Sequence, residues 1–258
     1  MIAASELYRG AGPYYARHGL TYPEDFFRSL VRICSLSNRT RALDLGAGTG
    51  QIAIPLARSV ANVLFVNPSD EMVQEGRRMA EAAGAANIDF LVSRAEDIDE
   101  PTSSFDIATI AGSFLWMDQT KVLAKLAHLP TPDGCVVITN RERDGSEPGE
   151  WHAAMMSDIR EFWGGTFPAG PGAVRPNLPP YREVLRASDF CEITELRHYY
   201  DHHWCLDDLL GYLYWLPGTL GARRDEFTTR MRRLLLSYSP SGSFVERGHH
   251  TTLLEYRH

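Results

Sequence analysis

The chain has 258 residues, of which 44% are hydrophobic and 23% are charged, ordinary values for a globular protein with a full core. Its formal net charge of −7 argues against electrostatic binding to nucleic acid or to an anionic membrane. No apolar run reaches the roughly 18 residues of a membrane-spanning helix, and the start lacks a signal peptide's basic flank and apolar stretch. Four scattered cysteines without a CxxC pair indicate lone thiols in a reducing cytoplasm, not a disulfide framework.

Helices and strands alternate along the first half of the chain. Strands this apolar, separated by helices, predict an α/β fold with a mostly parallel sheet covered on both faces. Ser69 is a plausible cap for the third helix, which ends at Gly84. The turn "TPDG" at 131–134 ends the fourth helix. In chain order the predicted elements are helix 24–36, strand 41–45, helix 50–60, strand 62–67, helix 69–84, strand 87–93, strand 105–112, helix 118–129 and strand 135–140.

After residue 140 the pattern changes to polar, Gly- and Pro-rich segments around an aromatic helix at 151–163. We interpret residues 141–185 as an insertion between strands five and six that roofs the site, since a long irregular segment is usually functional or mobile. A sixth strand follows at 191–204, then helices at 206–215 and 222–237, and a last strand at 249–256. The whole chain, 1–258, reads as one domain, with cap helices at 1–38.

A glycine-rich turn, "LDLGAGTG", follows the first strand. Without Cβ atoms at Gly46, Gly48 and Gly50, the chain can turn sharply and bring backbone N–H groups against a ligand. A hydride-transfer fingerprint needs a third glycine at position 51, where this chain has Gln51. Asp44 is a poor neighbour for a pyrophosphate but suits an ammonium group. The turn therefore predicts a ligand with a zwitterionic amino-acid moiety.

The segment "ALDLGAGTGQIAIPLA" resembles the first motif of class I S-adenosylmethionine-dependent methyltransferases. The likeness continues through "FVNPSDEMV", "SRAEDI", "FDIATIAGSFLWMD" and "PDGCVVIT", in the family's order and spacing. Upstream, "YYARHGLTYP" is similar to the small-molecule branch that includes trans-aconitate methyltransferase-like and methyltransferase type 11-like proteins. The resemblance is close over roughly residues 13–140. It implies a Rossmann-like, seven-stranded, mostly parallel sheet with an antiparallel last strand, helices on both faces and a helical roof.

The resemblance also implies a set of residues around S-adenosyl-L-methionine, or around its product S-adenosylhomocysteine. Asp44 would act on the ammonium group, and Asn67 stands where the family has an acid on the ribose diol. Ala95 and Glu96 would border the adenine. The implied cofactor-binding residues are Tyr15, Asp44, Gly46, Ala47, Gly48, Gly50, Asn67, Pro68, Ala95, Glu96, Ala111, Ser113 and Phe114.

Asn67 departs from the family, because an amide cannot offer the charge-assisted pair of hydrogen bonds that a carboxylate gives a diol. We interpret this as a tolerated variant that binds the same cofactor less tightly, and not as a degenerate site, because the glycines and Asp44 are intact. A second departure is Leu115, which stands where the family often has His and so removes one candidate base.

Histidines supply the remaining candidate bases, because neutral imidazole titrates in the right range. His18, His152 and His203 are the candidates. His202 and His203 lie beside Asp201, yet adjacent residues of an extended chain point to opposite faces. No helical i, i+4 pair supports zinc, so we expect no metal.

Aromatic residues are numerous at the N-terminus and in the roof. Core packing accounts for most of them, but an aromatic-walled pocket suits a bulky, largely apolar acceptor and a sulfonium cation. The predicted substrate pocket contains Tyr14, Tyr22, Leu115, Trp116 and Trp151.

The sequence thus predicts a cytoplasmic methyltransferase that acts on O, N or C of a small molecule in natural product biosynthesis, as a monomer or homodimer. One alternative is a cyclase or isomerase on the same fold that uses the bound cofactor or its pocket without transferring methyl. A less favoured alternative is an NAD(P) oxidoreductase. Product mass separates the first two, and nicotinamide absorbance on titration tests the third.

Overall fold

The structure, a computed structural model, describes residues 9–143, 149–164, 180–188, 193–216 and 221–256. The chain divides into two compact units. One comprises residues 1–20, 142–174 and 199–249, and we call it the helical unit. The other comprises residues 21–141, 175–198 and 250–258, and we call it the sheet unit. The chain passes from one unit to the other after residues 20, 141, 174, 198 and 249.

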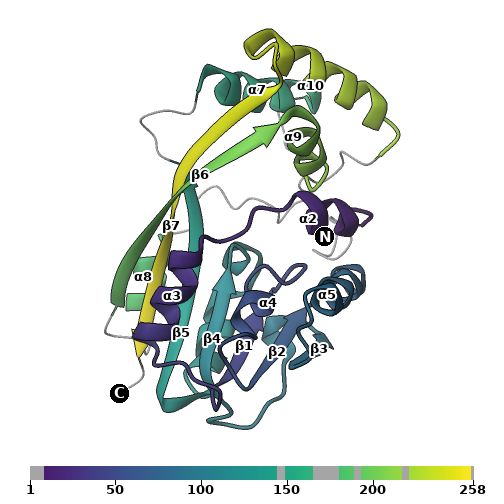
Figure 1. The fold of residues 1–258 in the computed structure, drawn as a ribbon. Coiled ribbons are helices and arrows are strands. Elements are labelled where there is room, and N and C mark those ends of the chain that lie inside the picture. The colour runs from purple at the N-terminus through teal and green to yellow at the C-terminus, as the bar shows by residue number, and fades with distance from the viewer. Residues whose placement is uncertain (1–8, 144–148, 165–179, 189–192, 217–220, 257–258) are drawn as a thin grey trace. The chain divides into compact units, whose positions relative to one another are not determined.

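Seven strands in the described residues form one sheet, in the order β3-β2-β1-β4-β5-β7-β6 (Figure 1). β1 pairs in parallel with β2 and β4, β2 with β3, and β4 with β5. The expected α/β fold, mostly parallel with an antiparallel end, is confirmed. The strands are β1 (Arg41–Leu45), β2 (Asn62–Asn67), β3 (Ile88–Val92), β4 (Phe105–Ala111), β5 (Pro130–Arg143), β6 (Ile193–Cys205) and β7 (Ser243–Tyr256).

Both faces of the sheet are buried at β1, β2 and β4, as their apolar sequences predict. Successive residues of one strand belong to two different core clusters. Ala42 and Ile107 lie in the cluster with Phe26 and Leu30, whereas Leu43 and Ala108 lie in the other. The first cluster is covered by α3 (Glu24–Ile33), α4 (Ala53–Leu56) and α5 (Asp70–Ala82), and the second by α6 (Gln119–Leu126) and α8 (Tyr181–Arg186).

The predicted cap of α5 is confirmed, because Ser69 Oγ accepts a hydrogen bond from Met72 N at the start of that helix. Asp118, which was not predicted as a cap, caps α6 by accepting from Lys121 N. Gly84 follows α5 with a φ of 68°, the left-handed conformation that ends many helices.

Several element boundaries differ from the prediction, and three of the differences have a clear local cause. α4 has only four residues. Pro55 cannot donate, and after Ala57 the bonds tighten to the i−3 pattern, with Arg58 N donating to Pro55 O and Ser59 N to Leu56 O. The turn expected at 131–134 lies within β5, as an irregularity between the partners of Phe105 and Ile107. β7 begins at Ser243, six residues before the predicted start. The sequence pattern missed these residues because their buried positions include Glu246, so polar and apolar residues do not alternate there.

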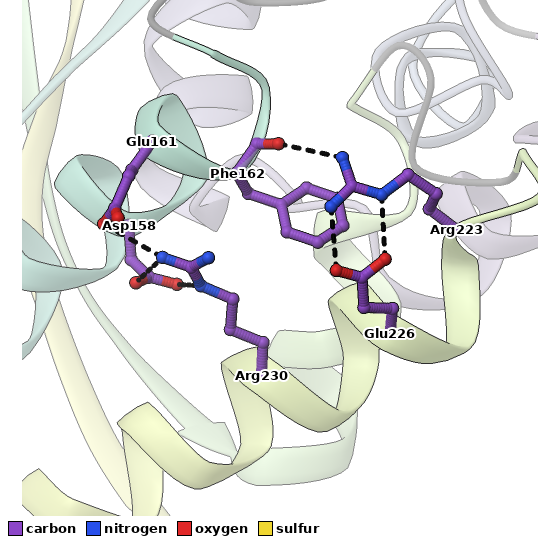
Figure 2. Close-up of polar contacts among 6 residues, drawn as sticks. All are labelled: Asp158, Glu161, Phe162, Arg223, Glu226 and Arg230. Atoms are coloured by element: carbon purple, nitrogen blue, oxygen red, sulfur yellow. Dashed lines mark hydrogen bonds and ion pairs between the residues drawn. The ribbon is translucent and has the colours of Figure 1, made fainter.

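The helical unit contains α2 (Gly12–His18), α7 (Glu150–Phe162), α9 (Leu206–Leu213) and α10 (Arg224–Tyr238). Its core includes Ile159, Phe227 and Leu235, all fully buried. Arg230 of α10 donates to both carboxylate oxygens of Asp158 at 2.7 Å and to Glu161 at 2.9 Å, both on α7 (Figure 2). These bonds join the two helices beside their apolar contact.

The single domain 1–258, the cap helices 1–38 and the roof 141–185 stay predictions. Much of the roof, at 144–148 and 165–179, lies outside the described residues, as do residues 1–8 of the cap. None of the helices that the structure describes is long and apolar enough to cross a bilayer.

Candidate functional site

The glycine turn lies at the carboxyl ends of the parallel strands, where open α/β sheets bind ligands. Gly46 and Gly48 have φ values of 67° and 61°, which favour glycine. Gly46 N and Ala47 N both donate to Val66 O at the end of β2, and Gly50 N donates to Ala47 O. The N–H of Gly48 has no acceptor among the residues that the structure describes. It is therefore available to a ligand.

Asp44 lies on β1 directly before the turn and is 1% exposed. Its Oδ1 accepts from Thr109 Oγ1 at 2.8 Å, and its Oδ2 accepts from Ala53 N at 3.1 Å. Burial raises the pKa of Asp44 to about 7, although the bonds from Thr109 and Ala53 lower it. A cation brought against this carboxyl would favour its ionised form.

Asn67 ends β2 and is buried. Its Oδ1 accepts from Ser69 N at 2.9 Å, which orders the turn before α5, and its backbone O accepts from Ser93 N at 3.1 Å. The side-chain oxygen that would accept from a ribose hydroxyl is therefore already engaged by the backbone. No partner is found for Nδ2 among the described residues, so Asn67 offers a diol mainly a donor. Pro68, next in the chain, is exposed.

Ala95 and Glu96 form a short 3₁₀ turn, η1 (Ala95–Asp97), after β3. Ala95 is 4% exposed. The Glu96 carboxylate accepts from Asp118 N at 2.8 Å and pairs with Arg94 at 3.0 Å. Burial raises the pKa of Glu96, but the Arg94 and Asp118 bonds outweigh it and the net pKa is lowered. This carboxylate is engaged in ordering η1, so any contact with a ligand base falls to the backbone.

The end of β4 supplies the last part of this edge. Ser113 Oγ donates to Leu45 O at 3.0 Å, which fixes the loop after Ala111 against β1. Phe114 is fully buried and stacks edge-on against Tyr181 with ring centroids 5.1 Å apart. It belongs to the core, and only its backbone is suited to a ligand. Leu115 and Trp116 of η2 (Phe114–Trp116) are half-buried.

The structure thus brings the ends of β1, β2, β3 and β4 together with most of the predicted cofactor residues. Tyr22, predicted to line the substrate pocket, lies in the sheet unit and packs on Phe26 and His250, with ring centroids 4.9 and 4.4 Å away. Its role in an acceptor pocket stays a prediction.

The other predicted residues belong to the helical unit. His18 Nδ1 lies 3.0 Å from Asp208 Oδ1, and His152 is buried whereas His203 is exposed. Tyr14 and Tyr15 contact the rings of Tyr214 and Trp215, and Trp151 contacts Phe244. Their assignments as bases, cofactor contact and pocket wall stay predictions. No cluster of three or more metal-ligating side chains occurs in the described parts of the chain.

The family described as "Methyltransferase domain" matches residues 42–134, which hold the glycine turn, Asp44 and Asn67. Curated proteins named as methyltransferases match between 38% and 64% of the chain, and solved structures of proteins titled as putative methyltransferases align with about nine tenths of it. The matched segment, residues 42–134, is a methyltransferase domain. The recognition and the enzyme class expected from the sequence are therefore confirmed.

Individual relatives of the methyltransferase domain are distant. The aklanonic acid methyltransferase DauC of a Streptomyces species is 28% identical over 64% of this chain and 68% of its own. The uncharacterized methyltransferase YcgJ of Bacillus subtilis is 32% identical over 43% of this chain and 44% of its own. Its crystal structure aligns with a TM-score of 0.61 at 16% identity, over 91% of this chain and 99% of that one. Apart from DauC, this chain spans half or less of the length of such curated relatives.

Sequence reasoning missed Thr109, which holds Asp44 from the neighbouring strand of the methyltransferase domain. The signal was present, since Thr109 is the one polar residue in the stretch 107–111 of β4. It is 1% exposed, and buried hydroxyls are usually hydrogen-bonded.

Proposed function

We propose that this protein transfers a methyl group from S-adenosyl-L-methionine to an O, N or C atom of a small-molecule acceptor. The observation that carries the proposal is the glycine turn of the methyltransferase domain, with an unengaged N–H at Gly48 and the buried carboxyl of Asp44 beside it. A carboxylate accepts hydrogen bonds and an ammonium donates them. The turn therefore presents one group for each end of an amino-acid moiety.

The residues present fit this cofactor. Gly48 N–H would hold the carboxylate. Asp44 would hold the ammonium, directly or through water, because each carboxylate oxygen keeps lone pairs beyond the bond it already accepts. Asn67 would donate through Nδ2 to the ribose hydroxyls, with η1 beside the adenine. Asn67 is the weakest element of the fit, since its oxygen is engaged by Ser69 N.

Bound S-adenosyl-L-methionine supplies an electrophilic methyl group that needs no further activation. The chain's task is then to orient the cofactor and acceptor, which is worth several orders of magnitude in rate. The end of β4 offers no imidazole, since Leu115 stands there. An acceptor that is already ionised, such as a carboxylate, needs no base. For a hydroxyl or an acidic carbon, His18, His152 and His203 remain the candidate bases.

The small-molecule acceptor is supported by the names of relatives. DauC is named an aklanonic acid methyltransferase, and another match is named a ubiquinone/menaquinone biosynthesis C-methyltransferase. The first name gives an organic acid and the second gives quinones. An acceptor that is an organic acid or is quinone-like is our proposal on this basis, and natural product biosynthesis and a cytoplasmic location are further proposals. So are a monomeric or homodimeric state and the absence of nucleic-acid and membrane partners, which the net charge of −7 supports.

Calorimetry with S-adenosylhomocysteine tests the cofactor, and we expect saturable binding below about 1 mM. Reaction with S-adenosyl-L-methionine and a panel of polycyclic carboxylic acids and demethylated quinones tests the transfer. We expect a product heavier by about 14 Da and one S-adenosylhomocysteine per turnover. No binding at 1 mM would refute the proposal. A converted acceptor of unchanged mass would instead support the cyclase or isomerase alternative.

A further inference from the structure

Two cysteines far apart in the sequence meet in the core of the sheet unit. Cys34 follows the last turn of α3, and Cys135 lies on β5, beside Ile107 of β4. They are 101 residues apart. α3 packs on this face of the sheet through Phe26 and Leu30, both fully buried. The packing of α3 therefore fixes where the Cys34 thiol lies.

The two sulfurs are 2.7 Å apart, with the Cys34 thiol donating to Cys135 Sγ. Both cysteines are reduced in this structure. Non-bonded heavy atoms in contact are usually about 3.5–4 Å apart, whereas a disulfide bond is about 2.05 Å long. A bond between the sulfurs therefore needs a movement of less than 1 Å, which side-chain rotation can supply.

The two thiols differ in accessibility. Cys34 is half-buried, whereas Cys135 is only 1% exposed. The hydrogen bond from Cys34 and burial both raise the pKa of Cys135 well above its ordinary value. Cys135 thus stays protonated and out of reach of solvent, and Cys34 is the thiol that a dissolved oxidant meets first.

We propose that Cys34 and Cys135 form a reversible redox pair that a hydroperoxide closes to a disulfide. The Cys34 thiolate attacks the peroxide O–O bond, which gives a sulfenic acid on Cys34 and releases hydroxide or alkoxide. Cys135 sulfur then attacks the Cys34 sulfur, its proton joins the departing hydroxyl, and water leaves. Two thiols lose two electrons and two protons, and with hydrogen peroxide the products are one disulfide and two waters. A dithiol reverses the reaction by exchange.

The bond would close a loop that contains the matched methyltransferase domain, since residues 42–134 lie between Cys34 and Cys135. No residue of the candidate cofactor site takes part in the pair. Cross-linking the two ends of a segment this long lowers the entropy of its unfolded state. Oxidation would therefore stabilise the methyltransferase domain without altering its cofactor contacts.

The full chain, fully reduced and then treated with hydrogen peroxide, tests the pair. We expect a loss of two of the four thiols and, after non-reducing tryptic digestion, one linked species joining peptides 33–39 and 126–141. We also expect Tm to rise by about 5–15 °C, and dithiothreitol to reverse both changes. Each protein is compared with its own reduced form, so a variant's lower starting stability does not affect the comparison.

Cys205→Ser is the matched control, because Cys205 is an exposed thiol of the helical unit. It should behave as the parent does, whereas Cys34→Ala and Cys135→Ala should form no 33–39/126–141 link and show no rise in Tm. Disulfides that form only through other cysteines, stepwise over-oxidation of Cys34, or a linked protein with unchanged Tm would each overturn the inference.

Discussion

Replacing Asn67 with Asp changes one atom, Nδ2 to a carboxylate oxygen, at the end of β2. Because Oδ1 of Asn67 accepts from Ser69 N at 2.9 Å, one oxygen of the new carboxylate should keep that bond and the turn before α5. The second oxygen then takes the place of the amide donor. It converts a group that can only donate to the ribose diol into one that accepts from both hydroxyls.

The expected gain in cofactor affinity is about fivefold, and at most about tenfold. A hydrogen bond to a charged group is worth about 1.5–3 kcal/mol, and the lost neutral bond offsets about 1 kcal/mol of it. Residue 67 is only 7% exposed, so burying a new charge there costs free energy, and Asp70 at the start of the next helix repels that charge. The N-terminus of α5 compensates by up to about 1 kcal/mol. The balance is about 1 kcal/mol, which is about fivefold.

Calorimetry of S-adenosylhomocysteine with parent, Asn67→Asp and Asn67→Ala measures the effect. Asn67→Ala should bind more weakly than the parent and lower Tm slightly, since Ser69 N loses its acceptor. Asn38→Asp is the matched control, because it makes the same charge change at an exposed position after α3.

Equal affinities for the parent and both Asn67 variants would refute the reasoning. Residue 67 would then not contact the ribose. A tenfold loss in Asn67→Asp with a normal Asn38→Asp would instead show that repulsion from Asp70 exceeds the new bonds.

Four further predictions concern the site and the helical unit. Because burial raises the pKa of Asp44 to about 7, affinity for S-adenosylhomocysteine should rise about tenfold between pH 5.5 and 7 as the carboxyl ionises, and Asp44→Asn should flatten that profile. The same raised pKa means that the folded chain keeps a proton which the unfolded chain loses from about pH 4 upward, so parent stability measured in urea should fall towards pH 7 relative to Asp44→Asn. Gly46→Ala should lower Tm by about 5–10 °C, because the new Cβ would lie 2.5 Å from Ser113 Oγ at a φ of 67°. Gly84→Ala is the control, since Gly84 has a φ of 68° but no atom lies within 4 Å of its Cβ position, and its loss of Tm should be clearly smaller. Equal losses would contradict the steric argument. Arg230→Ala should lower Tm by about 2–4 °C through loss of its bonds to Asp158 and Glu161 on α7 (Figure 2). Glu226→Ala is the comparison, because it removes a pair with Arg223, the residue directly before α10, and an equal change in Tm would show that the link between α7 and α10 contributes nothing.

The sequence by itself determined the elements whose signals are local. β1 and β2 begin and end where their apolar runs do, Ser69 caps α5, and the order of motifs indicated the methyltransferase class. Hydrophobic runs, caps and glycine turns involve residues within a few positions of one another. A single chain therefore carries enough information to place them.

Only the tertiary structure decided how distant residues engage each other. Thr109 of β4 bonds to Asp44 of the adjacent strand β1, 65 residues away in the sequence, and Cys34 contacts Cys135, 101 residues away. The sequence predicted that all four cysteines are lone thiols, because they form no spacing motif. No spacing rule could have paired Cys34 at the end of a helix with Cys135 on a distant strand. The sequence left the side-chain oxygen of Asn67 available to a ribose hydroxyl, whereas in the structure it accepts a hydrogen bond from Ser69 N. Such pairings depend on the register of strands and the packing of helices on them, which one sequence pattern cannot fix.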